Sequence, residues 1–553
     1  MGNGLLYIPE IPEIGADQQT PVVSRLLEIV ELQAQAIRQL QEQVQQQHEL
    51  IQQLRDEIAI LKGQKPRPTI SPSRLEQPAD APTLGKKQDR SRWKKRSKKA
   101  ELVIHETLPL RVPNPPPGST SHGYEEFIVQ ELIFEVHTTR YLRERLDLPA
   151  GGSMLAPLPA AVLPGSHFGS KLIAYILHEH YQCRVTQGVL LEKLQQIGVD
   201  ISAGQLSRIL IENKESYHQE KVEILVAGRE SEYIQVDDTG ARHQGKNGYC
   251  LHIGNDLFAY FESTDSKSRL NFLQVLRGPH TDYVINDVTL AYWERQKLPA
   301  EVQDKLRQGP QEFAADTAWQ TRLQELGSGS ERHVRMATEG ALLGSLIAHG
   351  VSPNLVVLSD GASQFDVLLH AACWIHVERL LAKLNPYSDK HRAAIESIRQ
   401  QLWEVYQELK AYKQKPAAAQ IAILETRFDA MVNQHTGFPS IDGVLKDMRA
   451  HRVDMLRILQ RPKVPLHNNT SEAHLRDYVI TRKIRGGTRS DEGRRCRDTF
   501  ATLKKTCRCL GVSFWEYLVD RVRSLAQVPR LADLIRQRQA ENQAARNVAA
   551  APT

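Results

Sequence analysis

Near the start of the chain the apolar positions follow a heptad. Over residues 26–61 apolar side chains recur alternately every fourth and every third residue, and nine of the eleven seam positions are apolar, the exceptions being Gln33 and Gln47. So narrow a stripe can be buried only against another helix. We therefore predict a coiled coil over 22–63 that mediates self-association. The alternative is a long helix packed on its own chain.

The pattern then changes. Residues 64–122 are rich in Pro, Ser and Lys and predict a basic, Pro-rich linker, and the alternation at 125–142 predicts a strand. Residues 170–215 have helical spacing, and their second half has helix-turn-helix character, with Gly198 at the turn and Ser202 as a helix cap. We predict a helical DNA-binding region over 123–225; an ordinary helical hairpin is the alternative.

From residue 232 the spacing becomes that of strands. Three β-rich runs separated by short turns, at 232–239, 247–254 and 257–263, predict a meander. A helix (268–277), a buried strand (354–361), a second helix (365–372) and a short strand (373–376) are predicted to follow. Mostly helical insertions are expected at about 280–350 and 378–460. Basic and amphipathic helices follow, and a frayed tail is predicted for 530–553. This order predicts an α/β, ribonuclease H-like core over 230–525.

The distribution of charge along the chain limits the classes of partner that it can bind. The 553 residues carry a net charge of +6, but segment 86–99 alone holds +8 and segment 476–508 holds +7, which leaves −9 for the rest. Concentrated basic charge on an acidic chain favours a nucleic-acid partner, although a single run could be a solvated face. The six scattered cysteines exclude a disulfide framework and indicate reduced thiols in the cytoplasm. No apolar run is long enough to span a membrane.

Three carboxylates stand where metal-dependent phosphoryl chemistry would need them. Asp237 ends a strand and Asp360 follows a buried apolar run, positions at which open sheets place their ligand sites. Alternation puts only one of Asp237 and Asp238 on a given face, so both remain candidates. Glu472 is the third candidate, although Asn469 could instead cap this helix with Glu472 as its capping-box partner. Acids of this kind could hold two Mg²⁺ ions about 3.5–4 Å apart.

Cations surround the third acid. Arg476 and Lys483 share a helical face with Glu472, and Arg482 and Arg485 lie close by, so all four are candidates for binding DNA phosphates. His376 follows the second acid and is expected to line the active site, with a buried structural histidine as the alternative.

A second group of possible metal ligands consists of His178, His180 and Cys183. No fourth ligand is spaced to join them, so a position on a helical surface or in a core is favoured for these residues.

Four runs resemble the insertion-sequence-66 family of bacterial transposases: VDDTGARHQGKNGY, SDGASQF, CWIHVERLL and HNNTSEAHLRDYVITRKIRGG. The resemblance spans roughly 170–525. It implies a DDE transposase with a ribonuclease H-like catalytic domain, in which Asp237, Asp360 and Glu472 bind two Mg²⁺ or Mn²⁺ ions. Asp237 matches the first acid of the family, which favours it over Asp238, and His376 and Asn469 are expected to line the site.

The same resemblance implies partners and a location. The expected partners are the terminal inverted repeats of an element and target DNA, in the bacterial cytoplasm at the nucleoid; the resemblance leaves open whether accessory proteins encoded by the same element take part. The chain departs from the family in lacking a Cys-rich zinc-binding segment, and in having Asp238 for Glu and His467 for Asp. A catalytically inactive, transposase-derived DNA-binding scaffold or regulator is therefore the alternative function.

Overall fold

The computed structural model describes residues 104–549 except 112, 120–123, 134, 150–151, 160–161, 163–164, 326 and 328–329, with side chains in the last helix described to 544. All of these residues belong to the second of the two units into which the chain divides, 78–553. The predicted coiled coil at 22–63, the basic run at 86–99 and most of the predicted linker lie outside the described residues.

The first described residues differ from the prediction. Residues 124–133 and 135–142 form no strand and are exposed, and Phe127 and Leu142 are each 90% exposed. The strand predicted at 125–142 is therefore wrong for these residues, because an alternating pattern forms a strand only where it finds a partner strand and a surface to cover. A short antiparallel pair follows, β1 (Arg145–Asp147) with β2 (Ser153–Leu155).

A group of helices comes next, as predicted for 170–215. It comprises α2 (Ser170–Leu177), a π-helical turn η3 (His178–Gln182), α3 (Gln187–Gln196), α4 (Ala203–Ile211) and α5 (Glu215–Gly228). Ser202 caps α4, and its hydroxyl accepts a hydrogen bond from the amide of Gln205. Gly198 makes the preceding turn at φ +90°, a conformation that glycine adopts without strain. A DNA-reading role for α3 and α4 stays a prediction.

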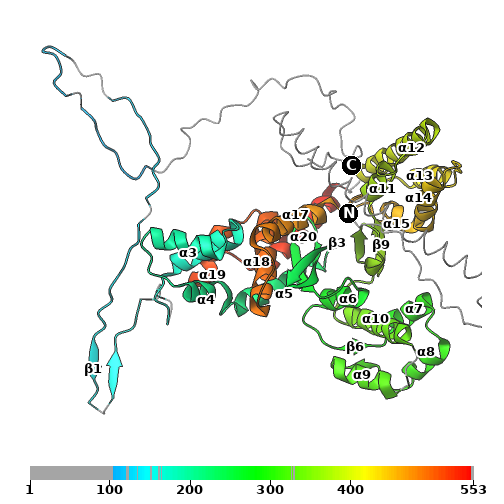
Figure 1. Ribbon diagram of the computed structural model, residues 1–553, viewed down its shortest axis with the longest axis horizontal. Helices are drawn as coiled ribbons and strands as arrows, with labels where there is room; N and C mark the ends of the chain where they lie inside the picture. The colour runs from blue at the N-terminus through cyan, green and yellow to red at the C-terminus, as the bar shows by residue number, and fades with distance from the viewer. Residues whose placement is uncertain are drawn as a thin grey trace, which may run out of the picture. The chain divides into compact units, whose positions relative to one another are not determined.

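A five-stranded mixed sheet lies at the centre (Figure 1). The predicted meander is confirmed as β3 (Tyr233–His243), β4 (Lys246–Gly254) and β5 (Ala259–Thr264), which pair antiparallel. After α6 (Arg269–Arg277), strands β8 (Val356–Ser359) and β9 (Leu369–Ala372) add in parallel on the other side of β3. The spatial order β5-β4-β3-β8-β9 is compatible with a ribonuclease H-like core.

Two short elements are exchanged relative to the prediction. The predicted helix at 365–372 contains strand β9, and the predicted strand at 373–376 instead begins helix α11 (Trp374–Ala382). Short apolar runs are ambiguous in period, and here pairing with the buried strand β8 decides the outcome. Cys373 is the N-cap residue between the two elements.

Both segments that were predicted to be mostly helical insertions contain helices. The first holds α7 (Asp287–Gln296), α8 (Ala300–Arg307), α9 (Asp316–Glu325) and α10 (Glu331–Ala348), with a pair of two-residue strands, β6 (Tyr283–Val284) and β7 (Glu312–Phe313). The second holds α12 (Asp389–Gln414), α13 (Ala418–Val432), α14 (Pro439–Ala450), α15 (Arg452–Met455) and α16 (Arg457–Gln460).

The C-terminal helices close the core. They are α17 (Asn469–Arg485), α18 (Asp491–Leu510), α19 (Phe514–Arg523) and α20 (Leu531–Ala549). The frayed tail predicted for 530–553 is wrong for the described part of that range, because Leu531 and Ile535 of α20 are fully buried in the main core. None of the described helices is both long and apolar enough to cross a bilayer.

Helix α18 covers the open edge of the sheet at β5. The amides of Ala259, Phe261 and Ser263 donate to side chains spaced one helical turn apart on α18, namely Thr506 Oγ1 (3.2 Å), Thr502 Oγ1 (3.0 Å) and Asp498 Oδ2 (2.8 Å). An uncovered edge strand would leave these donors without partners or available to another chain. The edge is therefore sealed by the fold itself.

Candidate active site

The pairing of β3 with β8 brings two of the predicted acids together. In this parallel register Tyr233 lies beside Val356 and Gln235 beside Leu358. The same offset places Asp237 beside Asp360, which is one residue past the end of β8. Residues in register on neighbouring strands share a face and start about 4.8 Å apart. Two acids far apart in sequence therefore become neighbours through strand pairing alone.

The first turn of α17 is fastened to β3 beside Asp237. The side-chain amide of Asn468 donates to the carbonyl of Val236 (2.9 Å), and the amide of Ser471 donates to Oε1 of Gln235 (3.3 Å). These bonds hold Glu472, the next residue, over the same strand. Asn468 is the N-cap residue and makes no side-chain cap bond, so the alternative of a capping box between Asn469 and Glu472 is wrong.

The charges of Asp360 and Glu472 both act on Asp237, although the ligand atoms of the three acids do not all lie within 4.8 Å of one another. Burial and, after it, the charge of Asp360 raise the pKa of Asp237 to about 7, with smaller contributions from the charges of Asp238 and Glu472. The amide of Asp238, which donates to Asp237 Oδ1 at 2.7 Å, opposes the rise. Half-buried carboxylates on neighbouring elements suit hard divalent cations, which prefer oxygen ligands. The donor set therefore fits Mg²⁺ or Mn²⁺.

Asp238 faces the other way and already has partners. Its carboxylate forms an ion pair with Lys267 and accepts a hydrogen bond from the side-chain amide of Gln364 (3.0 Å). Its side chain is only 8% exposed. Because its charge is neutralised within the protein, Asp238 is the poorer candidate for a metal ligand, and the geometry favours Asp237 as the first acid.

An arginine that the sequence reasoning missed also belongs to the site. Arg379 of α11 forms an ion pair with the carboxylate of Glu472. Helix α11 is held near α17 by backbone contacts, since the amide of Trp374 donates to the carbonyl of Leu466 (3.0 Å) and the amide of Asn468 donates to Sγ of Cys373 (3.3 Å). The signal was present in the run CWIHVERLL, where Arg379 lies one helical turn beyond His376.

The two predicted lining residues lie on these same helices. His376 is in the first turn of α11 and Asn469 is the first residue of α17, and both are half-buried. Their helices meet at the contacts of Trp374 and Asn468 described above. Their roles as lining residues stay predictions.

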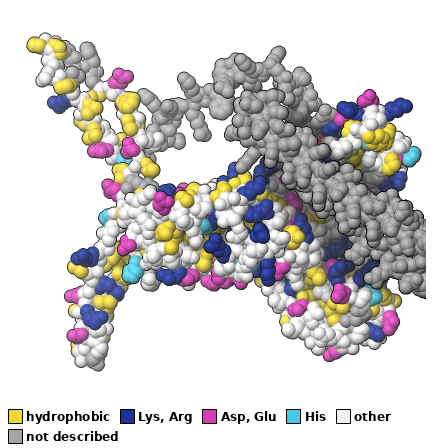
Figure 2. All heavy atoms as spheres, in the orientation of Figure 1, with side chains coloured by type: hydrophobic (Ala, Val, Ile, Leu, Met, Phe, Trp, Pro, Cys, Tyr) yellow, Lys and Arg dark blue, Asp and Glu magenta, His cyan; other side chains and the backbone are white. Residues whose placement is uncertain are grey.

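The four predicted phosphate-binding cations differ in exposure. Arg476 and Lys483 are exposed on α17, whereas Arg482 is half-buried and its Nη1 lies 3.5 Å from the position that a Cβ on Gly240 would occupy. The guanidinium of Arg485 lies over the ring of Tyr181, 5.5 Å from its centroid, and burial lowers its pKa to about 10. Arg485 is therefore committed to packing. Figure 2 shows Lys and Arg side chains gathered over α17 and α18.

Comparison with known proteins supports the class that the sheet order and acids suggest. The model of the transposase IS66 family matches residues 356–495, which contain Asp360, Arg379 and Glu472. An uncharacterized protein of Sinorhizobium fredii, y4jO, is 40% identical over 293 residues, which are 52% of this chain and 91% of that protein. A second, y4qI of the same organism, is 26% identical over 184 residues, 32% of this chain and 34% of that protein.

These matches define the chain as a transposase-type protein. It belongs to the transposase IS66 family.

Proposed function

We propose that this chain is the DNA transposase of an insertion element, which binds element ends and catalyses metal-dependent strand cleavage and strand transfer. Asp237, Asp360 and Glu472 are the metal-binding acids. The observation that carries the proposal is the β3–β8 register, which brings Asp237 beside Asp360, together with the docking of α17, the helix that carries Glu472, on β3.

Each part of the site has a role in this proposal. Two Mg²⁺ or Mn²⁺ ions, when bound, stabilise the charge on the attacking and leaving oxygens of a phosphodiester. Asp237 within β3, Asp360 directly after β8 and Glu472 on α17 would hold these ions. Arg379 neutralises Glu472 in the metal-free protein and is placed to contact a phosphate once the carboxylate is engaged elsewhere.

The exposed cations extend the site along the DNA. Arg476 and Lys483 lie on the same helix as Glu472, so a duplex whose scissile phosphate is at the acids can pass over them. Arg482 is placed closer to β3 and is a weaker contact. Self-association through the coiled coil at 22–63 would bring two protomers, and so two element ends, together; this part of the proposal falls on residues outside those described.

The test compares Asp360→Asn with Asp238→Asn. Purified full-length protein is incubated with a duplex carrying the terminal repeats that flank its gene, in Mg²⁺ or Mn²⁺, and both DNA binding and cleaved or joined products are measured. We expect Asp360→Asn to lose cleavage by at least about a hundredfold while it keeps DNA binding, since it removes charge from the metal site alone. Asp238→Asn should keep most cleavage if it folds normally.

Three other outcomes are informative. Unchanged activity in Asp360→Asn would refute the assignment of that acid. DNA binding by the wild-type protein without cleavage in either metal would favour the inactive scaffold or regulator. Cleavage without joined products would indicate a nuclease that does not perform strand transfer.

A further inference from the structure

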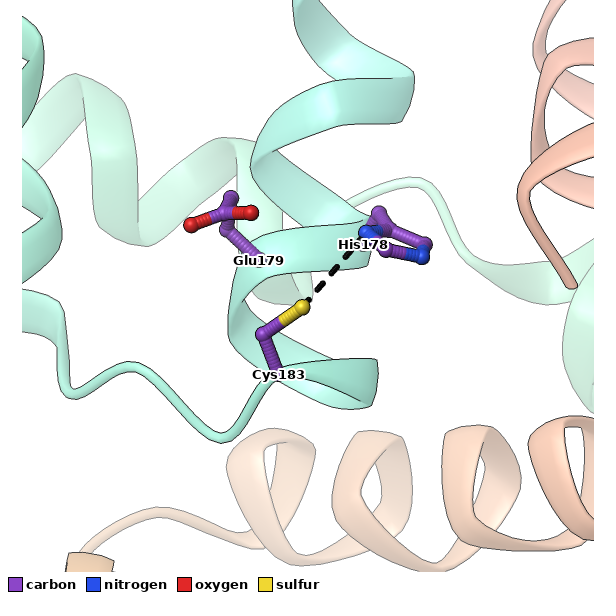
Figure 3. Close-up of side chains that lie close together, drawn as sticks. All are labelled: His178, Glu179 and Cys183. Atoms are coloured by element: carbon purple, nitrogen blue, oxygen red, sulfur yellow. Dashed lines mark hydrogen bonds between the residues drawn. The ribbon is translucent and has the colours of Figure 1, made fainter. Parts of the chain in front are cut away.

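Three metal-ligating side chains meet on the turn between α2 and α3, outside the candidate active site. The Nδ1 of His178, a carboxylate oxygen of Glu179 and the Sγ of Cys183 all lie within 4.8 Å of one another (Figure 3). The spacing of residues in the sequence does not predict this group. Glu179 was not among the candidate ligands, and His178 and Cys183 are five residues apart. In an α-helix, residues five apart point about 140° away from each other.

A π-helical turn removes that separation. The amide of Cys183 donates to the carbonyl of His178, five residues earlier, at 3.1 Å, so the two side chains stack on the same side of the turn. Single π-helical turns are rare and are often found at functional sites. His180, the other histidine considered from the sequence, is excluded from the group: it is buried, and its Nδ1 is hydrogen bonded to the carbonyl of Val185 (2.9 Å).

The distance between the donor atoms of His178 and Cys183 suits a tetrahedral ion. Sγ of Cys183 and Nδ1 of His178 are 3.7 Å apart. Zinc–sulfur and zinc–nitrogen bonds of about 2.3 and 2.0 Å at a tetrahedral angle put the two ligand atoms about 3.5 Å apart. The pair can therefore hold an ion with only a small adjustment of side chains on an exposed turn.

The surroundings orient the ligands. The ring of His178 packs edge-on against Trp515 of α19, at a centroid distance of 5.6 Å, which limits the orientations open to the imidazole. Lys193 of α3 donates to Glu179 Oε2 at 2.8 Å. Lys193 thus occupies the carboxylate in the metal-free protein and would compete with an ion for it.

We propose that His178, Glu179 and Cys183 form a site for a borderline divalent cation of the Zn²⁺ type, with a fourth position open to water. Binding releases the thiol proton of Cys183 to solvent and displaces the ammonium of Lys193 from Glu179. The mixed nitrogen, oxygen and sulfur donors distinguish this site from the all-carboxylate cluster, which suits Mg²⁺. The ion would cross-link the beginning and the end of the η3 turn, next to α19.

A second group of possible ligands among the described residues does not have this geometry. The rings of His280 and His349 are stacked face to face, with centroids 3.5 Å apart and planes 7° from parallel. In-plane lone pairs of stacked imidazoles point in parallel directions and do not converge on one ion. Asp282 is already engaged by His349 (2.8 Å) and Ser345 (3.1 Å).

The test uses Co²⁺ as the probe, because a cobalt–thiolate bond gives a charge-transfer band in the near ultraviolet that oxygen ligands do not give. Full-length protein, reduced and freed of metal by a chelator, is titrated with Co²⁺ and then with Zn²⁺. We expect a band that saturates at one Co²⁺ per chain and is abolished by stoichiometric Zn²⁺. Cys183→Ser and His178→Ala should each lose this band.

Matched variants separate this site from other thiols. Cys509→Ser is the control, because Cys509 also lies 3.7 Å from a histidine nitrogen, that of His474, but belongs to no three-ligand group among the described residues. That variant should keep the full band. Glu179→Gln should weaken Zn²⁺ affinity about tenfold or more, and Lys193→Met should strengthen it, since the competing cation is gone. Absence of the band in the wild-type protein, or its persistence in Cys183→Ser, would overturn the proposal.

Discussion

Replacing Asp237 by Asn is expected to stabilise the protein in the absence of divalent ions. The pKa of this carboxyl rises from 3.8 to about 7 in the folded chain, first through burial and then through the charge of Asp360. A rise of about three pKa units corresponds to roughly 4 kcal/mol of unfavourable free energy for the ionised form. Because the side chain is only partly buried and the neighbouring acids titrate together, this value is an upper bound on the gain.

The effect has a defined pH window. The unfolded chain ionises this group near pH 3.8, whereas the folded chain keeps the proton until about pH 7. The folded state therefore binds more protons in this interval, and its stability falls as the pH rises through it. The gain from Asp237→Asn should be negligible below about pH 4, roughly 1.5 kcal/mol at pH 5, and largest above pH 7.

Urea unfolding followed by circular dichroism measures this gain at pH 5 and pH 8, with EDTA and again with excess Mg²⁺. With Mg²⁺ the order should reverse, because the wild-type protein gains the free energy of ion binding and the variant has lost a ligand. Asp238→Asn is the matched control: it breaks the ion pair with Lys267 and should destabilise the protein by about 1–3 kcal/mol. If Asp237→Asn destabilises the metal-free protein as much as Asp238→Asn at pH 8, the inferred cluster of repelling acids is wrong.

Four further variants test other parts of the structure. Arg379→Ala should raise the affinity for Mn²⁺ severalfold in calorimetry, because Arg379 no longer competes for Glu472; unchanged or weaker binding would contradict this. For DNA binding, Lys483→Ala should reduce the slope of the logarithm of the binding constant against the logarithm of the salt concentration by about one. Arg485→Ala should leave this slope unchanged and should lower the urea concentration at the midpoint of unfolding. Thr502→Val should cost about 1–3 kcal/mol in urea unfolding, because it leaves a buried amide of β5 without an acceptor; a neutral effect would show that the edge is not sealed by α18.

Much of the fold was predictable because local patterns determine it. The meander was visible as three alternating runs, and the buried strand before Asp360 as a continuous apolar run. The assignment of β9 and α11 failed because their short apolar sequences fit either period. The choice depends on the pairing of β9 with β8, which in turn pairs with β3, more than a hundred residues earlier in the chain. The prediction of a frayed tail at 530–553 was wrong for its described part because much of that sequence is polar, although Leu531 and Ile535 pack α20 into the core.

The candidate site shows the same division. Asp237, Asp360 and Glu472 could be proposed from short segments and from a resemblance, although Asp237 lies within β3, which continues to His243, and not at the strand end that was predicted. Arg379 could not be singled out in the same way, since its importance comes from an ion pair across 93 residues. The group on η3 was missed for a different reason: a π-helical turn changes which residues share a face, and helical spacing rules assume that no such turn occurs.

The three acids are held by interactions of different stiffness, which suggests how the site responds to its ions. Asp237 lies within β3 and Asp360 directly follows β8, whereas Glu472 lies on α17, which is held to β3 by the side chain of Asn468 and the amide of Ser471, and it is paired with Arg379. Asp237 and Asp360 would hold a bound cation, and Arg379 would compete with that cation for Glu472. Glu472 is thus the member whose position can change without disturbing the sheet, and its release from Arg379 would couple ion binding to the freeing of a guanidinium for DNA phosphate.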